Sequence, residues 1–447
     1  MSILQDSELD EYVIQEENRQ RTSITLIASE NYVFPGVYKY SGSLLTNKYS
    51  EGKVGARYYG GTKYIDIIES QCKDRILALF ELDPSVWGVC VQSYSGSIAN
   101  LSAYSAMVTP GGKIMGMNLP AGGHLTHGFQ TKTRKVSGTS VYFSSHPYEV
   151  DANGYLDYNH IRTRFNEVSP EVLICGYSAH SQDINYALLR GIVTDKAFLY
   201  ADISHISALI ASKLMNNPFI HCDVVMTTTH KGLRGPRGAI IMYRKCVTVN
   251  GTTHDLDNKM NLAVFPLIQG GPHNHTIAGI SHSMYMAKQP EFITYCKQVV
   301  SNARIMCDYF KQRNYSVVTD STVNHMVIID LHSKGVSGQE VESFCDYLGI
   351  NINKNSVPRD KSCLFKPSGI RLGVYAITTR GFKEGDTYLV CDMVHTAIML
   401  LQDTVSARSK HKSVKDWIIS EDILNQEGIK NIIQNIFNLT KKYPVPE

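Results

Sequence analysis

The sequence has few of the features that mark a secreted, metal-binding or membrane protein. Its ten cysteines include no Cys-x-x-Cys pair, so neither a zinc site nor a disulfide framework is expected. We predict free, mostly buried thiols, and no metal site. The N-terminus is acidic and lacks an apolar segment of signal-peptide length, and no apolar run is long enough to cross a membrane. A cytoplasmic protein is therefore expected.

An excess of charge of either sign is also missing. The chain carries 44 basic and 41 acidic residues, a formal net charge of +3, and no segment stands out as a basic arm. Nucleic acid is therefore not an expected partner. A small anionic substrate or cofactor would need local positive charge instead. The 447 residues are enough for one large domain and a smaller one, each with its own core.

Short apolar runs alternate with helix-length segments from about residue 60 to residue 285. Residues 65–80 repeat apolar side chains at helical spacing, which predicts a helix. Runs that are apolar on both faces are typical of buried parallel strands. The pattern therefore predicts a doubly wound α/β sheet. Its strands are expected at 86–91, 172–175, 197–201, 224–226 and 239–242.

The pattern changes beyond about residue 285, where a smaller α+β domain is expected. Strands are predicted at 316–318 and 326–329, and a helix at 338–348. An apolar stripe from Ile429 to Phe437 predicts a helix near the C-terminus. At the other end, residues 1–45 are predicted to form a helix and an extended arm. The expected division is thus 1–45, a large domain over 46–285 and a small one over 286–447.

Two polar groups follow predicted strands of the large domain. Lys231 lies in the cluster Thr227–Lys231, directly after the 224–226 run, and Asp202 follows 197–201. In open α/β sheets, ligands bind beyond the carboxyl ends of strands. A lysine there can form a Schiff base with an aldehyde cofactor, and a carboxylate can keep a pyridine nitrogen protonated. Taken alone, the lysine is more simply an ordinary solvated residue at a strand end, whereas the aspartate is about equally a helix N-cap or a functional carboxylate.

A possible phosphate site lies earlier in the chain. Ser95-Gly96-Ser97 stands between an apolar run and a helical stretch, and a helix N-terminus binds phosphate well. A turn with an N-cap is the commoner use of so short a motif. His124, in Gly122-Gly123-His124, could supply an imidazole that stacks on a ring, although a lone histidine is more often structural. The chain order of the three sites favours pyridoxal phosphate.

These residues lie in segments that resemble the serine hydroxymethyltransferase family over nearly the whole chain. The resemblance implies a fold-type I enzyme, with a mostly parallel sheet in the large domain and a smaller α+β C-terminal domain. It implies reversible conversion of serine and tetrahydrofolate to glycine and 5,10-methylenetetrahydrofolate, with pyridoxal 5'-phosphate as cofactor. The matching segments are Leu26–Asn31, Asn47–Gly52, Arg57–Gly61, Gly122–Gly128, Thr227–Gly235, Phe265-Pro266, Gln269–His275, Asn353–Asn355 and Ser368–Gly373.

The resemblance also implies a role for each matching residue. Lys231 would bind the cofactor covalently, Asp202 would pair with the pyridinium, and Glu51 would carry the proton of the hydroxymethyl step. The other cofactor contacts implied are Tyr49, Ser95, Gly96, His124, Ser178, His205, Thr228, His230, Arg237 and, from a second subunit, Gly271. The amino acid would meet Arg371, Ser29, Glu51 and, again from a second subunit, Tyr59, with His205 and Tyr59 also counted as catalytic. Folate contacts are expected at Leu119, Gly123, Leu125 and Asn355.

The same resemblance implies an obligate homodimer with shared active sites, and His273-Asn274-His275 resembles the tetramer-forming eukaryotic branch of the family. Several positions depart from the family pattern, which puts folate affinity and side activities in doubt, and the Lys53-Val54-Gly55 departure predicts a looser loop beside Glu51. The departures are Lys53, Ala121, His180, Gly232, Arg359, Val374 and Tyr375.

Two other functions compete with this interpretation. A pyridoxal-phosphate aldolase that acts without folate would have no use for Leu119, Leu125 or Asn355. A scaffold that kept only the fold would not be expected to retain Lys231, Glu51 and Arg371. The sequence does not decide whether carbon transfer runs by retro-aldol release or by direct attack of folate.

Overall fold

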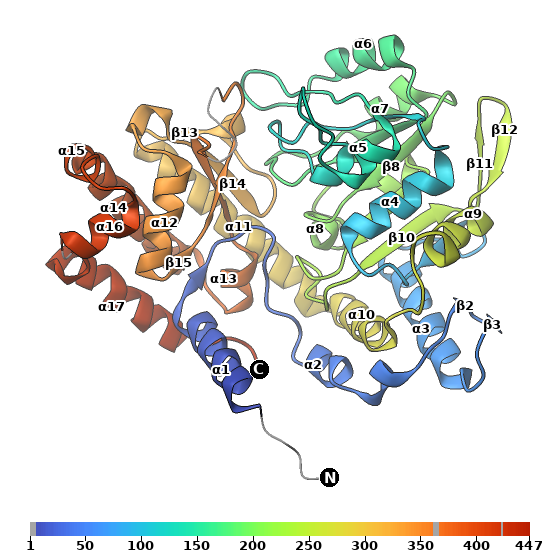
Figure 1. Cartoon of the computed structure of the whole chain (residues 1–447), viewed down its shortest axis with the longest axis horizontal. Helices are drawn as coiled ribbons and strands as arrows, with labels where there is room; N and C mark the ends of the chain where they lie inside the picture. The colour runs from blue at the N-terminus through green and yellow to red at the C-terminus, as the bar shows by residue number, and fades with distance from the viewer. Residues whose placement is uncertain (1–5, 361–365, 422) are drawn as a thin grey trace. The chain divides into compact units, whose positions relative to one another are not determined.

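The computed structural model describes residues 6–360, 366–421 and 423–447, and these divide into two compact units (Figure 1). One unit is continuous in sequence and spans Val33–Lys297. The other combines Met1–Tyr32 with Gln298–Glu447, so it contains both ends of the chain. The boundary between Lys297 and Gln298 falls within the long helix α11 (Pro290–Gln312).

The continuous unit is built on a seven-stranded sheet. All five apolar runs predicted as strands are found in it, and the predicted mostly parallel α/β class is confirmed. Neighbouring strands from β6 to β9 are parallel. The sheet order is β4 (Trp87–Cys90), β10 (Ala239–Arg244), β9 (Val224–Thr228), β8 (Phe198–Asp202), β7 (Val172–Gly176), β5 (Lys113–Met115) and β6 (Ser144–Ser145).

Strand β10 runs antiparallel to both of its neighbours, β9 and β4. The prediction of a parallel strand at 239–242 is therefore wrong. The reason is the connection: β9 ends at Thr228 and β10 begins at Ala239, and the loop between them contains no helix. A return to the same end of the sheet needs a dozen or more residues, usually with a helix.

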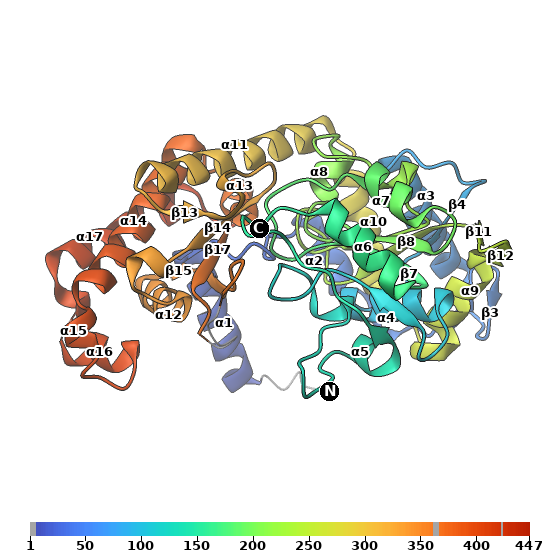
Figure 2. The same cartoon turned by 90° about the horizontal axis from the view of Figure 1, so that it is seen from above.

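Helices α4 (Gly96–Met107) and α9 (Leu256–Leu262) lie together against one face of the sheet (Figures 1 and 2). Their apolar side chains share one core with alternate residues of the strands, such as Ile174, Tyr200 and Met226. The intervening strand residues are buried as well, as expected for a sheet covered on both faces.

Shorter elements complete this unit. The predicted helix at 65–80 is confirmed as α3 (Lys63–Leu79). The other helices are α2 (Gly36–Ser41), η1 (Leu44–Asn47), η2 (Leu125–His127), α5 (Gly138–Tyr142), α6 (Tyr158–Val168), α7 (Tyr186–Val193), α8 (Ser207–Ala211), η3 (Pro218–Ile220), η4 (Ala263–Ile268) and α10 (Asn274–Ala287), and two hairpins pair β2 (Gly52–Lys53) with β3 (Ala56–Arg57) and β11 (Cys246–Val249) with β12 (Thr252–Asp255).

The second unit contains a four-stranded antiparallel sheet with helices, and its predicted strands and helices are found. The sheet order is β13 (Ser316–Val317), β14 (Met326–Asp330), β17 (Gly369–Gly373) and β16 (Asn353–Asn355). The helices after α11 are η5 (Val318–Asp320), η6 (His332–Lys334), α12 (Gly338–Leu348), α13 (Tyr375–Thr379), α14 (Glu384–Asp403), α15 (Val405–Arg408), α16 (Val414–Ser420), η7 (Ile423–Asn425) and α17 (Glu427–Lys442).

The two chain ends are joined inside this second unit. Helix α1 (Ser7–Thr22) has no buried residue, but β1 (Ile24–Thr25) after it pairs in parallel with β15 (Ile350–Asn351). The buried guanidinium of Arg380 then ties both ends together through backbone carbonyls. It donates to Arg21 O at 3.2 Å and Ser23 O at 2.8 Å on one side, and to Thr440 O at 3.1 Å and Tyr443 O at 2.7 Å on the other.

Two expectations about composition can be compared with the described residues. Every cysteine among them is unpaired, and each is buried except Cys246, which confirms the prediction of free thiols. None of the helices in the part of the chain that the structure describes is long and apolar enough to cross a membrane.

Candidate active site

Asp202 and Lys231 lie at the carboxyl ends of neighbouring parallel strands. Asp202 is the last residue of β8, and Lys231 follows three residues after the end of β9. Both side chains are buried. Burial alone would raise the pKa of Asp202, but the hydrogen bond to His127 and the positive charge of Lys231 hold that pKa well below its usual range. Asp202 is therefore an anion at neutral pH.

The carboxylate of Asp202 accepts four hydrogen bonds from the protein. Oδ2 accepts from Asn100 Nδ2 at 3.0 Å and faces His127 Nε2 at 3.2 Å. Oδ1 accepts from the backbone N–H of Ser204 at 3.1 Å and from its hydroxyl at 2.6 Å. Sequence reasoning missed both Asn100 and Ser204. The one signal for Asn100 is that it is the only amide side chain in the helix Gly96–Met107.

The loop that carries His124 is held against the segment that carries Ser178. The carbonyl of Gly122 accepts from Ser178 N at 2.7 Å and from Ala179 N at 3.0 Å. Gly122 has a φ of +110°, and a β-carbon there would lie 2.1 Å from the carbonyl oxygen of Ala179. Only glycine permits this approach, which brings the predicted residues His124 and Ser178 to the same region.

Ser95, Gly96 and Thr228 also come together, at the start of α4. Ser95 is the N-cap, and its hydroxyl accepts from Ile98 N at 3.4 Å. A β-carbon on Gly96 would lie 2.6 Å from Cγ2 of Thr228, the last residue of β9. The Oγ1 of Thr228 is buried and has no hydrogen-bond partner among the described residues. A phosphate at this helix N-terminus would give that hydroxyl an acceptor, so the residues fit the group.

His230 lies among positive charges on the loop after β9. Burial, followed by the charges of Lys231 and Arg237, lowers the pKa of His230 to about 3. The imidazole is therefore neutral at neutral pH. His205, another predicted cofactor contact, is buried three residues after Asp202.

A second group of predicted residues surrounds Glu51. The charge of Glu51, followed by burial and a hydrogen bond to Glu51, raises the pKa of Tyr59. The rings of Tyr49 and Tyr59 lie 5.3 Å apart. A β-carbon on Gly271 would lie 2.9 Å from the ring of Tyr49, and Tyr94 donates its hydroxyl to Gly271 O at 2.6 Å. The predicted residues Tyr49, Glu51, Tyr59 and Gly271 thus gather in one place.

The hairpin next to Glu51 is anchored by Arg57. This buried guanidinium donates to Asp66 at 2.7 Å and to Glu69 at 2.7 Å, both on α3. It also donates to the carbonyls of Ser50 at 2.9 Å and Gly52 at 2.7 Å. Two bonds to the residues on either side of Glu51 and two bonds to α3 therefore hold this segment. The chain has Lys53-Val54 here, where the family pattern has an aromatic residue and proline.

Arg371, Ser29 and Asn355 belong to the other unit. Burial lowers the pKa of Arg371 to about 10, so its guanidinium remains charged at neutral pH. Its Nε donates to Asn353 Oδ1 at 3.1 Å, across the β16–β17 pair. Two residues later, Gly373 donates to Leu26 O at 2.7 Å. This contact places the segment that carries Ser29 against the end of the strand that carries Arg371.

Two of the departures from the family pattern are buried aromatic groups. Burial lowers the pKa of His180 to about 4, and its ring meets Tyr177 edge-on at 5.1 Å. Tyr375 stacks on His325 at 4.1 Å, and His325 Nε2 lies 3.1 Å from the carbonyl of Ala28. Tyr375 is therefore part of the packing that supports the Ser29 segment.

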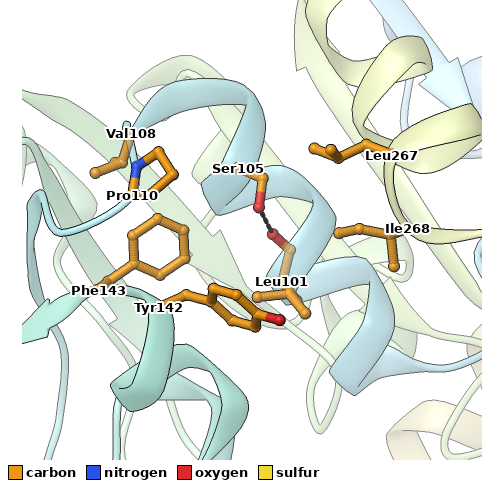
Figure 3. A pocket seen from close by; sticks show the side chains of 8 residues that line it. All are labelled: Leu101, Ser105, Val108, Pro110, Tyr142, Phe143, Leu267 and Ile268. Atoms are coloured by element: carbon orange, nitrogen blue, oxygen red, sulfur yellow. Dashed lines mark hydrogen bonds between the residues drawn. The ribbon is translucent and has the colours of Figure 1, made fainter.

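A cavity of about 530 Å³ opens in the continuous unit, away from the residues discussed so far. Apolar side chains line it, and the hydroxyl of Ser105 turns back to Leu101 O at 2.9 Å (Figure 3). No charged side chain lines it, so it offers nothing to an ionic substrate. Its lining residues are Leu101, Ser105, Val108, Pro110, Tyr142, Phe143, Leu267 and Ile268.

Comparison with known proteins agrees with the family resemblance on which these site residues were predicted. The family model described as serine hydroxymethyltransferase matches residues 3–394. The chain is 50% identical over 444 residues to "Serine hydroxymethyltransferase, cytosolic" of Encephalitozoon cuniculi, covering 99% of this chain and 96% of that protein. The protein of the same name from Oryctolagus cuniculus is 42% identical over 452 residues, with 99% and 93% covered. "Probable serine hydroxymethyltransferase, cytosolic" of Schizosaccharomyces pombe is 47% identical over 401 residues, with 88% and 86% covered.

Proposed function

The chain belongs to the serine hydroxymethyltransferase family. We propose a role in the family's reaction for each candidate residue. The family's enzymes depend on pyridoxal phosphate and use tetrahydrofolate. The reaction converts serine and tetrahydrofolate to glycine and 5,10-methylenetetrahydrofolate, and it is reversible. The observation that carries the assignment of residues is the placement of Asp202 and Lys231 at adjacent strand ends.

Asp202, Lys231 and His124 form the proposed cofactor site. When bound, pyridoxal phosphate withdraws electrons from the α-carbon of an attached amino acid. Asp202 is kept anionic by its surroundings and would hold a proton on the ring nitrogen. Lys231 supplies the amine for the covalent link, and His124 stacks on the ring. Further contacts come from Tyr49, Ser178, His205, His230 and Arg237.

The phosphate is proposed to lie at the N-terminus of α4. Ser95 and Gly96 begin this helix, and Thr228 offers a buried hydroxyl without a partner among the described residues. The backbone N–H groups and dipole of a helix N-terminus attract an anion. Gly271 of a second subunit completes the phosphate contacts in this proposal.

Arg371 is proposed to bind the carboxylate of the amino acid. Its planar fork matches a carboxylate with two parallel hydrogen bonds, and Asn353 fixes the plane through Nε. Holding the carboxylate determines which bond of the α-carbon stands perpendicular to the ring, so binding energy is used for orientation. Ser29, on the segment against β17, would line the same substrate.

Glu51 and Tyr59 are proposed to serve the hydroxymethyl group. They already interact in the single chain, where Glu51 raises the pKa of Tyr59, so in this proposal a second subunit that supplies Tyr59 supplies its own Glu51 as well. Glu51 would carry the proton that the leaving hydroxymethyl group exchanges. Contacts to the folate are proposed for Leu119, Gly123, Leu125 and Asn355.

We further propose a homodimer in which each subunit completes the site of the other, with a tetramer as its possible higher assembly. In the single chain, Tyr49 is 57% exposed and Tyr59 is 43% exposed, although the reaction needs both in a site shielded from water. A second subunit over this cluster would provide that shielding. Because the relatives from Encephalitozoon cuniculi and Oryctolagus cuniculus are named cytosolic, we propose the cytosol as the location.

Reduction with borohydride tests the covalent link. Treating the purified protein and pyridoxal phosphate with borohydride should fix the cofactor to the peptide that contains Lys231, as read by mass spectrometry. Lys231→Arg should fix none. Lys213→Arg is the matched control, because Lys213 is an exposed lysine paired with Glu81 at 2.7 Å. Cofactor fixed equally to the Lys231→Arg protein would overturn the assignment.

The dependence of serine cleavage on tetrahydrofolate tests the reaction class. Glycine formation from serine should rise strongly when tetrahydrofolate is added. Equal rates with and without it would indicate an aldolase instead. A protein that binds pyridoxal phosphate yet shows no change in its visible absorption with serine or glycine would indicate a scaffold.

A further inference from the structure

A buried chain of polar side chains lies behind Asp202. At its centre is Asn100, which is on α4 and completely buried. Its Nδ2 donates to Asp202 Oδ2 at 3.0 Å and to Thr126 Oγ1 at 2.7 Å. Its Oδ1 accepts from the hydroxyl of Tyr200 at 2.5 Å. One amide thus uses three hydrogen bonds to join α4 to β8, at two positions, and to η2.

The direction of each bond follows from the carboxylate. An ionised Asp202 can only accept, so the amide nitrogen of Asn100 must face it and the amide oxygen must face Tyr200. Burial raises the pKa of Tyr200 well above its ordinary value, so the phenol keeps its proton and donates it. No alternative orientation of the amide satisfies both neighbours.

The assignment of donors and acceptors extends through Thr126 to His124. Because Thr126 Oγ1 accepts from Asn100, its own proton is available for His124 Nδ1, which lies 2.7 Å away. The backbone N–H of Thr126 also points to His124 Nδ1, at 3.2 Å. Two donors converge on this nitrogen, so it must be an acceptor, and the imidazole carries its proton on Nε2.

His127 links the backbone of His124 to the carboxylate of Asp202. Its Nδ1 accepts from the backbone N–H of His124 at 3.2 Å, which places its proton on Nε2. Nε2 lies 3.2 Å from Asp202 Oδ2 and can donate to it. The carboxylate and the two histidines are therefore linked by hydrogen bonds whose donors and acceptors are all determined.

We propose that Asn100 is a positioning residue that couples Asp202 to His124. Through direct contact it fixes the carboxylate, and through the hydroxyl of Thr126 it orients the imidazole, whose tautomer the backbone N–H of Thr126 also supports. This inference rests on the proposed cofactor site, where Asp202 faces the ring nitrogen and His124 stacks on the ring. A single amide would thus orient the two groups that hold the same heterocycle from different directions.

The ¹⁵N signals of the His124 ring provide a test of the coupling that needs no cofactor. In the full-length protein labelled with ¹⁵N-histidine, His124 should show an unprotonated Nδ1 and a protonated Nε2; its signal is identified by its loss in His124→Phe. Asn100→Leu and Thr126→Val should each shift the Nδ1 resonance of His124, because the Thr126 hydroxyl is freed from Asn100 or lost, while the backbone N–H of Thr126 continues to keep Nδ1 unprotonated. An unchanged His124 signal in both variants would overturn the proposal, whether or not the protein binds pyridoxal phosphate.

Cofactor binding tests the consequence. Asn100→Leu and Thr126→Val should each raise the dissociation constant for pyridoxal phosphate about tenfold, the usual effect of losing a hydrogen bond in a network with a charged group. Each should also shift the pH midpoint of the absorption of the bound cofactor. Thr126→Ser keeps the hydroxyl and should restore both values. The double variant should lose less than the sum of the two single changes, because both interrupt one chain.

Ser102→Ala is the matched control. Ser102 lies on the same helix, is completely buried, and its hydroxyl has no partner among the described residues, so its loss should leave affinity and pH midpoint within about twofold of the parent protein. Variants of Asn100 and Thr126 that behave like this control would overturn the proposal alone. A parent protein that fails to bind pyridoxal phosphate would overturn the proposed function instead.

Discussion

At position 180 a histidine is buried beside Tyr177, and its burial has a consequence for stability. Its pKa is about 4 in the folded protein and 6.5 without burial. As the pH falls from 6.5 to 4, the unfolded chain binds a proton that the folded chain refuses, so stability is lost in that window and is fully present above it. At pH 5 the loss should be about 2 kcal/mol.

His180→Phe should therefore reduce the loss of stability between pH 7.5 and pH 5 by about that amount. Urea unfolding at the two pH values measures it. His160→Gln is the control, because His160 is an exposed histidine on α6, and it should keep the parent protein's pH dependence. An equal loss in the parent and in His180→Phe would show that the imidazole does not titrate as its burial implies.

The planar shape of the Arg371 guanidinium leads to a prediction about serine binding. Lysine keeps the charge but lacks the planar fork, so Arg371→Lys should raise KM for serine about 10- to 100-fold. The affinity for pyridoxal phosphate should stay within about twofold. Steady-state kinetics and a cofactor titration separate the two effects. A KM near that of the parent protein would remove Arg371 from carboxylate binding.

Residues within the family motifs could be predicted from the sequence. Residues outside the motifs that position them through hydrogen bonds could not. Lys231 and Asp202 follow apolar runs, so a strand-end argument finds them. Asn100 lies in the middle of a helix, and nothing in the sequence says which way its amide points. Its role depends on Thr126 and Tyr200, which other elements bring to it.

Helix α12 shows which elements the sequence predicts well. Its predicted and observed bounds agree at Gly338–Leu348, because Ser337 and Glu340 form a capping box and Gly349 ends the helix with a φ of +86°. Strand β10 shows the opposite case, since an apolar run says nothing about strand direction. Two-residue strands such as β1 carry no periodicity, and only their partner reveals them.

The capping box supports a prediction for α12. The hydroxyl of Ser337 accepts from Glu340 N at 3.3 Å, and Glu340 accepts from Ser337 N at 2.8 Å. Ser337→Ala should lower the free energy of unfolding by about 1 kcal/mol. Ser343→Ala, in the middle of the same helix, should change it by less than about 0.5 kcal/mol. Equal losses in urea unfolding would show that the cap adds no stability of its own.

At the scale of the whole molecule, Arg380 joins the first and last parts of the chain. Arg380→Met keeps an unbranched apolar side chain but removes four charge-assisted hydrogen bonds to backbone carbonyls. The expected loss of stability is at least about 3 kcal/mol. Hydrogen exchange should also accelerate at Ile24 and Thr25, which the same carbonyls adjoin. Arg162→Met, an exposed arginine on α6, should change neither quantity.

Because the N-terminal segment packs against segments near the C-terminus, it can complete its fold only late in synthesis. The ribosome releases Val33–Lys297 as one uninterrupted stretch, so its sheet can close while translation continues. Ile24 and Leu26, which are completely buried in the finished protein, must wait for their backbone partners near Ile350 and Asn351 to emerge. During that interval the segment that contains Ile24 and Leu26 exposes apolar side chains, which makes it a binding site for a chaperone.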